Sequence, residues 1–156
     1  MILAIDPGTH AGWAHMLNGS RSSGTWNFQT KTKTKSRPAE PKHFRLLHAN
    51  TSLQYHCDTW GFPDLIVCED AAGFTRGKSA VEASHKFRAV VELFCAVKNI
   101  KLLYVQPADV KRWATGKGNA DKEEMLAVAR ERFGYQGSDD NEADAILIRE
   151  WYLGLK

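Results

Sequence analysis

Three carboxylates stand where this sequence would otherwise bury apolar side chains. Asp6 follows the apolar run 2–5 (ILAI), Glu69 follows the run 65–68 (LIVC), and Asp144 lies in an apolar helical pattern near the C-terminus. Burying a lone carboxylate costs several kcal/mol or forces the group to take up a proton. Two acids at strand ends and one on a helix would therefore suit a divalent cation and metal-assisted phosphodiester hydrolysis.

The length and the cysteine content indicate one intracellular domain. A chain of 156 residues is expected to form a single domain over residues 1–156. No apolar run is long enough to cross a bilayer, so we expect no membrane segment and no signal peptide. Three cysteines without paired spacing favour a reducing compartment over a structural zinc site. We therefore expect a cytoplasmic protein.

Positive charge is unevenly distributed along the chain. The net charge is only +3, yet the segment 31–45 holds six cations and one acid. A second basic region covers residues 111–117, and acids gather at 139–144. Basic flanks around an acidic centre fit a polyanion that lysines hold while its scissile bond meets the carboxylates. The alternative is that most of these lysines are solvated surface residues.

Short apolar runs separated by turn signals predict an α/β fold with a mixed five-stranded sheet. Strands at 2–5, 11–17 and 24–29 would form an antiparallel meander, and strands at 65–69 and 102–105 would extend the sheet in parallel. Helices would flank the sheet at 41–58, after Ser79, and at 108–114, 120–133 and 141–153. The Thr/Lys alternation and two prolines within residues 30–41 predict a flexible basic loop.

The alternation of side chains along a strand separates two neighbouring acids, Glu69 and Asp70. Successive strand residues face opposite sides of a sheet, so only one of these acids can share a face with Asp6. We choose Glu69, because it is the first charge after the apolar run and has the longer reach. We expect Asp70 to cap a loop.

Asp144 has two neighbours that could supply a fourth oxygen ligand. On a helix, Asp140 lies four residues before Asp144 and Asn141 three residues before it, both on the same face. The alternative for Asp139 and Asp140 is a capping role at the helix N-terminus, where acids are favourable.

A lysine and an aromatic residue are further candidates for the site. Lys122 leads an apolar helical stripe, so it either extends its ammonium to solvent or points into the site against a phosphate or the attacking water. Phe74 lies in a glycine-bounded loop after Glu69, and could stack on an unpaired base with Arg76 and Lys78 on the backbone. Phe74 could equally belong to the core.

These motifs together resemble the RuvC family of Holliday-junction resolvases, within the RNase H-like nucleases. The similar segments run in family order over nearly the whole chain, and they are ILAIDPGTHAGWA, LIVCEDAAGF, PADVKRWATGKGNADKEEM and NEADAILI. The resemblance implies an RNase H-like sheet flanked by helices. It also implies that Asp6, Glu69 and Asp144 are metal-binding catalytic acids.

The resemblance extends to nucleic-acid contacts. Lys111 and Lys122 match the family's functional lysines, and Phe74 matches its stacking aromatic residue. With the basic residues around them, the residues expected to contact nucleic acid are Phe74, Arg76, Lys78, Lys111, Arg112, Lys117 and Lys122.

The chain departs from the family pattern at two places. The best-known members carry a fourth Asp three residues before the last acid, where this chain has the neutral Asn141. The site would then work with three acids, or with help from Asp140. The stretch 19–41 is longer and more basic than in bacterial members and is similar to phage and viral relatives. The expected cytoplasm is then that of a bacterium, or that of a host cell if the protein is phage-encoded.

We therefore expect a Mg²⁺-dependent, structure-selective DNA endonuclease that resolves four-way junctions by paired symmetric hydrolysis. Two cations, for which Mn²⁺ could substitute, would be bridged by Asp6, with Glu69 and Asp144 completing the oxygen coordination. A homodimer would match the two equivalent strands of a symmetric junction.

Three alternatives remain open at this point. The same fold could serve a nuclease for forks, flaps or RNA–DNA hybrids, because such enzymes read shape through backbone contacts. Asn141 is the only hint of a non-catalytic protein that binds branched DNA. An ATP-binding domain of the actin and sugar-kinase group would need a second such domain, for which this chain is too short.

Overall fold

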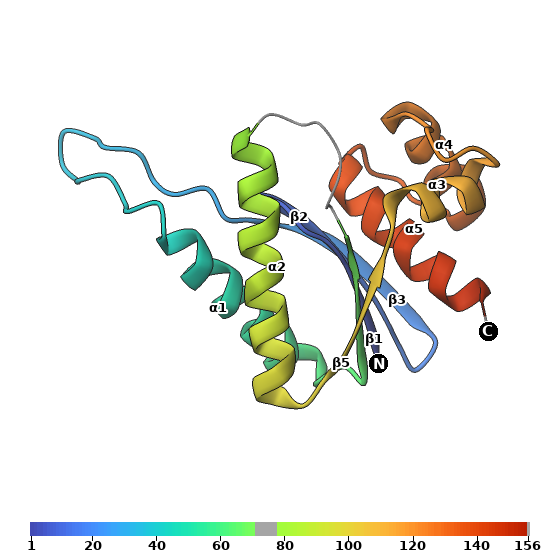
Figure 1. Ribbon diagram of the computed structural model, residues 1–156, viewed down its shortest axis with the longest axis horizontal. Helices are drawn as coiled ribbons and strands as arrows, with labels where there is room; N and C mark the ends of the chain where they lie inside the picture. Colours follow the sequence, from blue (N-terminus) through green and yellow to red (C-terminus); the bar gives the residue numbers. More distant parts are fainter. Residues whose placement is uncertain (71–77, 156) are drawn as a thin grey trace.

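Strands and helices follow the predicted order along the chain (Figure 1). The computed structural model describes residues 1–70 and 78–155, and for residues 78–80 it describes the backbone alone. The strands are β1 (Ile2–Asp6), β2 (His10–Leu17), β3 (Ser20–Asn27), β4 (Leu65–Glu69) and β5 (Lys101–Val105). The helices are α1 (Phe44–Trp60), α2 (Lys78–Lys98), α3 (Pro107–Thr115), α4 (Lys122–Phe133) and α5 (Asp140–Gly154).

The strands form one mixed sheet in the order β3-β2-β1-β4-β5. β1 and β2 are antiparallel, as are β2 and β3. β4 lies parallel to β1, and β5 lies parallel to β4. The predicted antiparallel meander with parallel strands beside it is therefore confirmed, and the two parallel connections run through α1 and α2, as such crossovers require.

The prediction of the third strand at 24–29 was wrong at both ends, because β3 covers Ser20–Asn27. Asn18 and Gly19 have positive φ angles of 50° and 82°, and Leu17 pairs with Ser20 across them. A two-residue turn with positive φ at both positions matches the twist of a β-hairpin, and Asn-Gly is its preferred sequence. Because the first residues of β3 are polar, the apolar pattern begins too late in the sequence. The Asn-Gly turn marks where the strand actually begins.

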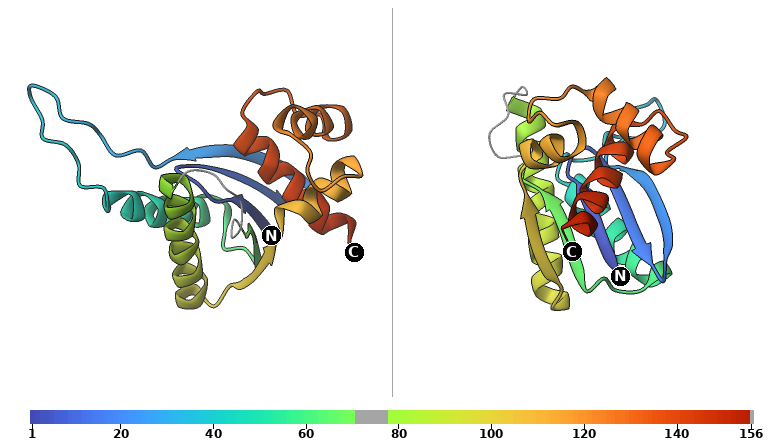
Figure 2. Two further views of the ribbon diagram at one scale, coloured as in Figure 1. Left: turned by 45° about the horizontal axis from the view of Figure 1, so that its top comes forward. Right: turned by 90° about the vertical axis from the view of Figure 1, so that its right-hand side faces the viewer.

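The predicted basic loop is a long extension between β3 and α1, and it reaches far from the sheet (Figure 2). We call residues 30–41 the basic arm. Its two sides are joined near the base, where the Glu40 amide donates to the Lys31 carbonyl at 2.9 Å and the Lys31 amide donates to the Glu40 carboxylate at 2.8 Å. Thr34 and Arg37 form a bridge near the tip. The flexibility of the basic arm stays a prediction.

The sheet separates two cores. α3, α4 and α5 cover one face, and α1 and α2 cover the other (Figures 1 and 2). Ala4 of β1 and Val67 of β4 belong to the core under α5. Ile5 and Cys68, one position further along, belong to the core under α1 and α2. By this alternation the next residue of β1, Asp6, faces α5.

α5 lies directly against β2 at Gly12. A β-carbon on Gly12 would lie 1.8 Å from the Asn141 carbonyl oxygen and 2.4 Å from the Asn141 carbonyl carbon. Gly12 pairs with Asp6 in the β1–β2 register. The missing side chain therefore allows the first turn of α5 to approach the sheet beside Asp6.

Buried polar contacts hold the rest of α5 on the sheet. Arg149, which is 3 % exposed, donates to the His15 carbonyl at 3.1 Å and pairs with Glu150 at 2.8 Å. Arg21 of β3 reaches Glu150 at 3.2 Å. At the other end of the helix, Ser23 donates to Glu142 at 2.8 Å. These contacts fix the helix along its length.

The three cysteines, Cys57, Cys68 and Cys95, are buried free thiols. Burial raises the pKa of Cys57 and Cys95 to about 11, which keeps both protonated and poorly reactive. Across residues 1–70 and 78–155, no helix combines the length and the apolar character that a bilayer crossing needs.

A buried histidine pair joins the sheet to α1. His15 Nδ1 lies 3.1 Å from His56 Nε2, and the two side chains are 1 % and 3 % exposed. Burial, and secondly the charge of His15, lower the pKa of His56 to about 4. Burial, and secondly Arg149, also lower the pKa of His15. One ring must donate and the other accept, so the contact needs at least the accepting ring to be neutral.

Acidification should destabilise the fold through this histidine pair. The folded-state pKa of His56 lies below its ordinary value of 6.5, so the unfolded chain binds more protons between these values. The stabilising contribution is complete above pH 6.5 and is lost as the pH falls toward 4. We expect the free energy of unfolding in urea to drop by about 2 kcal/mol from this site between pH 7.5 and pH 5.

The matched comparison is His56→Gln beside His85→Gln, because His85 is exposed on α2. His56→Gln should flatten the pH dependence, and His85→Gln should leave it as in the wild type. Identical pH slopes for all three proteins would contradict the assignment.

Gly12→Ala should push the first turn of α5 off the sheet. The clash is with backbone atoms, so the free energy of unfolding should fall by at least ~2 kcal/mol, measured by urea denaturation. Gly154→Ala, at the other end of α5, is the control, because its nearest neighbour, Trp113, would lie 3.5 Å away in ordinary contact. A Gly12→Ala protein as stable as the control would show that the close contact does not constrain the helix.

Candidate active site

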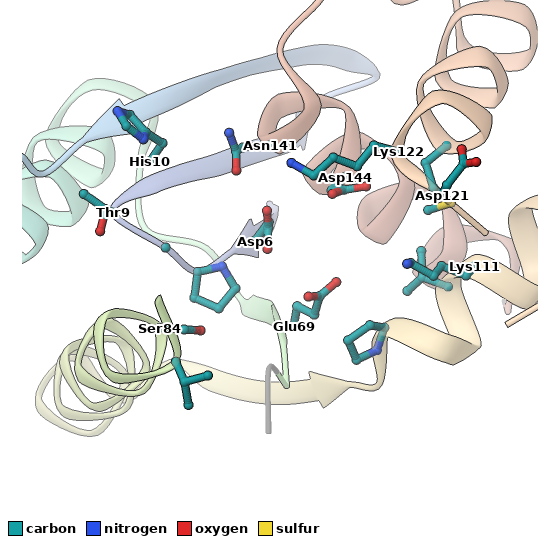
Figure 3. A pocket seen from close by; sticks show the side chains of 16 residues that line it. Asp6, Thr9, His10, Glu69, Ser84, Lys111, Asp121, Lys122, Asn141 and Asp144 are labelled. Atoms are coloured by element: carbon teal, nitrogen blue, oxygen red, sulfur yellow. The ribbon is translucent and has the colours of Figure 1, made fainter. Parts of the chain in front are cut away.

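A cavity of about 290 Å³ lies between the ends of β1 and β4 and the first turns of α4 and α5. Asp6, Glu69 and Asp144 all line it, and their side chains face a common space (Figure 3). The structure thus brings together the three acids that the sequence singled out. The other lining residues are Pro7, Gly8, Thr9, His10, Val81, Ser84, Pro107, Val110, Lys111, Asp121, Lys122, Met125 and Asn141.

The two strand acids meet because β1 and β4 are parallel neighbours in register. Ile5 pairs with Cys68, so the following residues, Asp6 and Glu69, end the two strands side by side. Both are half-buried. Each lies one residue beyond a side chain of the α1/α2 core, so both point to the α5 face.

Asp70 is directed away from this cavity. It pairs with Arg88 of α2, and it accepts a hydrogen bond from Gln106 Nε2 at 2.9 Å. Its amide donates to the Val105 carbonyl at 2.7 Å, which prolongs the pairing of β4 with β5. Its described contacts are thus with α2 and with residues at the end of β5. They lie on the face of the sheet opposite to Glu69, as strand alternation predicts.

The first two turns of α5 present Asn141 and Asp144 to the cavity. Asp139 is the N-cap and accepts hydrogen bonds from the Asn141 and Glu142 amides. It also accepts from Asn141 Nδ2 at 3.1 Å, which leaves the amide oxygen of Asn141 toward the acids (Figure 3). Burial would raise the pKa of Asp139, but hydrogen bonds from Thr25 and Asn141 outweigh it and lower that pKa.

Asp140 does not line the cavity and forms an ion pair with Lys122. The capping role foreseen for Asp139 and Asp140 falls to Asp139, and Asp140 occupies the first helical position. Of the two residues considered for a fourth oxygen, the structure therefore places Asn141, and not Asp140, at the cavity wall.

The donor set of the cavity suits a hard divalent cation. Three carboxylates and one amide oxygen are the oxygen ligands that Mg²⁺ and Mn²⁺ prefer. In the part of the chain that the structure describes, no three acidic, histidine or cysteine side chains are gathered closely enough to form a ready-made metal cluster. The donors fit such an ion by their chemistry, and they are spread around the cavity.

Lys111 and Lys122 add positive charge to the same cavity (Figure 3). Lys111 Nζ donates to the Ala120 carbonyl at 2.8 Å, which holds it at the wall. Lys122 is the first residue of α4, whose capping box is formed by Asp121 and Glu124. The ammonium of Lys122 thus reaches the cavity and is also largely exposed.

The other residues predicted to contact nucleic acid lie outside the cavity or outside the described residues. Arg112 and Lys117 are exposed and do not line the cavity; they pair with Asp109 and Glu124. Phe74 and Arg76 lie outside the described residues, and so does the side chain of Lys78. These five contacts stay predictions.

Sequence reasoning missed Ser84. It lies on α2, is 6 % exposed, and faces the cavity (Figure 3). Its hydroxyl oxygen has no hydrogen-bond partner among the described residues. The sequence did carry a signal for this residue. Ser84 lies three residues before Phe87 and seven before Val91, so it is a polar residue on the core-facing side of the helix.

Sequence comparison places the chain among known nucleases. A family profile described as "Crossover junction endodeoxyribonuclease RuvC" matches residues 2–148. A protein of the same description from Caldicellulosiruptor saccharolyticus is 28 % identical over 152 residues, which covers 94 % of this chain and 88 % of the relative. One from Endomicrobium trichonymphae is 31 % identical over 151 residues, covering 95 % and 77 %.

Solved structures share the fold. Thermus thermophilus RuvC superposes with a TM-score of 0.68 at 20 % identity, covering 99 % of this chain and 95 % of that one. The same protein in complex with a Holliday junction substrate gives 0.72 at 17 % identity, covering 99 % and 94 %. The yeast mitochondrial Holliday junction resolvase gives 0.57 at 11 % identity, covering 97 % and 77 %.

The expected fold and family are therefore both confirmed. The sheet order and the helices on its two faces are those of solved resolvases, and the profile spans nearly the whole sequence. That family implies a metal-dependent nuclease. The chain belongs to the RuvC family of crossover junction endodeoxyribonucleases.

Proposed function

We propose that this protein resolves four-way DNA junctions by hydrolysing one phosphodiester in each of two equivalent strands, at the cavity that contains Asp6, Glu69 and Asp144. The observation that carries the proposal is the convergence of these acids from β1, β4 and α5 on one open cavity with lysines at its wall. The acids would hold the catalytic cations, and the lysines would hold the anionic strand.

We further propose Mg²⁺ as the physiological cation, two ions per site, with Mn²⁺ able to substitute. Asp6, Glu69 and Asp144 would hold the ions through their carboxylates. When bound, the cations supply Lewis acidity that favours attack by water and stabilises the leaving oxygen. We favour Asn141 for the fourth oxygen, because Asp139 orients its amide and Lys122 engages Asp140.

The chain's own residues would bind and orient the strand. Lys111 and Lys122 would place their ammonium groups against phosphate oxygens, and the Ser84 hydroxyl would donate to the scissile phosphate. Further along the strand, Phe74 would stack on an unpaired base. Contacts to the remaining backbone would come from Arg76, Lys78, Arg112 and Lys117.

A homodimer is the assembly that fits this substrate. A symmetric junction offers two equivalent strands, and a two-fold dimer would present one cavity to each. That Thermus thermophilus RuvC has been solved with a Holliday junction supports the choice of substrate. The competing functions are cleavage of forks or flaps with the same cavity, and binding of branched DNA without cleavage.

Cleavage of a labelled four-way junction with Mg²⁺, beside a linear duplex and a flap, distinguishes these functions. We expect paired, symmetric nicks on the junction and little cutting of the controls. Tight binding without cutting, in Mg²⁺ and in Mn²⁺, would reject the enzymatic role. Equal cutting of all three substrates would retain the nuclease and reject the resolvase.

Replacing any one of the three acids by its amide should abolish cleavage without abolishing junction binding. Asp6→Asn, Glu69→Gln and Asp144→Asn should each lower the single-turnover rate by more than ~100-fold, beyond the ~10–100-fold typical of residues that only support a metal ligand. Asp70→Asn is the matched control, since Asp70 adjoins Glu69 but pairs with Arg88. If Asp70→Asn were as inactive as Glu69→Gln, the assignment of Glu69, and not Asp70, to the catalytic site would be refuted.

Ser84→Ala should slow cleavage without lowering the stability of the fold. Loss of one hydrogen bond to the scissile phosphate should slow cleavage by about tenfold at saturating junction. The stability to urea should stay the same or rise by up to ~1 kcal/mol, because the mutation removes a buried hydroxyl that has no partner among the described residues. An unchanged cleavage rate would show that the hydroxyl does not touch the substrate.

A further inference from the structure

A second cavity, of about 400 Å³, adjoins the first. Gly8 and Thr9, in the turn between β1 and β2, line both cavities, so the two meet at this turn. The remaining wall comes from the residue that follows β3, the N-terminal part of α1 with the residues before it, and the first half of α2. Those residues are Phe28, Lys42, His43, Arg45, Leu46, Ala49, Glu82, Ala83, Lys86 and Phe87.

The charge of this second cavity is opposite to that of the catalytic acids. Lys42, Arg45 and Lys86 line it together with His43, and Glu82 is the one acid among its described lining residues. Glu82 pairs with Lys86. The pKa of Glu82 is lowered by that contact first, and also by Lys42 and Arg45, so all three cations act on the same space. Their joint field favours an anion there.

Arg45 lines this cavity and has unused hydrogen-bonding capacity. Its Nε is buried and has no hydrogen-bond partner in residues 1–70 and 78–155. A guanidinium N–H without an acceptor is costly when buried, and phosphate oxygens are the acceptors that arginine binds best. A phosphate in the cavity that Arg45 lines would offer its guanidinium an acceptor.

The basic arm extends the same positive surface. Lys31, Lys33, Lys35 and Arg37 are all exposed on it, and Lys42 follows almost directly at the edge of the cavity. The segment 31–45 carries six cations and one acid, a net charge of +5, whereas the whole chain carries +3. The rest of the chain is therefore net negative, at −2, so this segment dominates the attraction for a polyanion.

We propose that the second cavity and the basic arm bind the phosphates of the DNA arm that leaves the catalytic cavity across Gly8 and Thr9. This inference rests on the proposed function, because the polyanion is the same junction whose scissile phosphate meets the acids. The phosphates would lie along one continuous backbone, with the reacting bond at the acids and its neighbours at Lys42, Arg45 and Lys86. The cavity would thus contribute to affinity and leave the chemistry unchanged.

The test compares two double variants that remove the same amount of charge. Lys42→Ala/Lys86→Ala removes two exposed cations of the second cavity, and Lys98→Ala/Lys101→Ala removes two exposed cations at the far end of α2 and the start of β5. Binding of a four-way junction is measured without divalent cation over a range of salt concentrations. Each phosphate that no longer meets a cation should lower the slope of log K against log salt by about 0.9.

The cavity variant should bind the junction about tenfold more weakly than the control variant, with a salt slope smaller by about 2. With Mg²⁺, its KM should rise while kcat at saturating junction stays at the wild-type value. Replacing the four arm cations by Gln should lower the slope further. Equal affinity and equal slope for the two double variants would overturn the inference, as would an effect confined to kcat.

The wild-type protein separates failure of the second phosphate site from failure of the proposed function. If the wild type neither binds nor cuts the junction, the proposed function is rejected and the second cavity has no such substrate. If the wild type binds and cuts while the cavity variant equals the control variant, only the second phosphate site is rejected.

Discussion

The close contact between Gly12 and the first turn of α5 is the constraint on which the rest of the site depends. The backbone of Asn141 occupies the volume that any side chain at position 12 would fill. Gly12 also pairs with Asp6, so this contact brings the helix acid to the strand acid. Arg149 and the hydrogen bonds from β3 then hold α5 in that position. An acidic cavity assembled from three separate segments requires such a fixed approach, because its members cannot position one another through mutual repulsion.

The sequence allowed the sheet and the acids to be predicted because both depend on local patterns. Asp6 and Glu69 end apolar strands, and alternation separates Glu69 from Asp70 without knowledge of the fold. The start of β3 was missed because Ser20–Ser23 lack apolar character, although Asn18-Gly19 marks the turn. The pairing of Asp140 with Lys122 depends on how distant elements pack, and it leaves no periodicity in the sequence from which it could be predicted. Helical spacing does place Ser84 on the core-facing stripe of α2, but its lack of a hydrogen-bond partner among the described residues depends on that packing.

The acids proposed to carry out the chemistry and most of the cations proposed to attract the DNA lie in different parts of the molecule. Carboxylates lie on the α5 face at the ends of β1 and β4, and the excess positive charge lies mainly on the segment 31–45 and on α2. Asn141 keeps one oxygen at the cavity without adding a fourth negative charge, which lowers the repulsion that cations must offset. The cations outside the acidic cavity then supply attraction for the strand, and that attraction weakens with salt.

If three acids from β1, β4 and α5 hold divalent cations in one cavity, metal binding should depend on each of them even without DNA. Mn²⁺ would be titrated into the wild-type protein and into Asp144→Asn, with free Mn²⁺ followed by electron paramagnetic resonance. We predict saturable binding by the wild type and an affinity at least ~10-fold weaker in the variant. Equal affinity in the two proteins would contradict the assignment of the three acids, because it would place the metal outside this cavity.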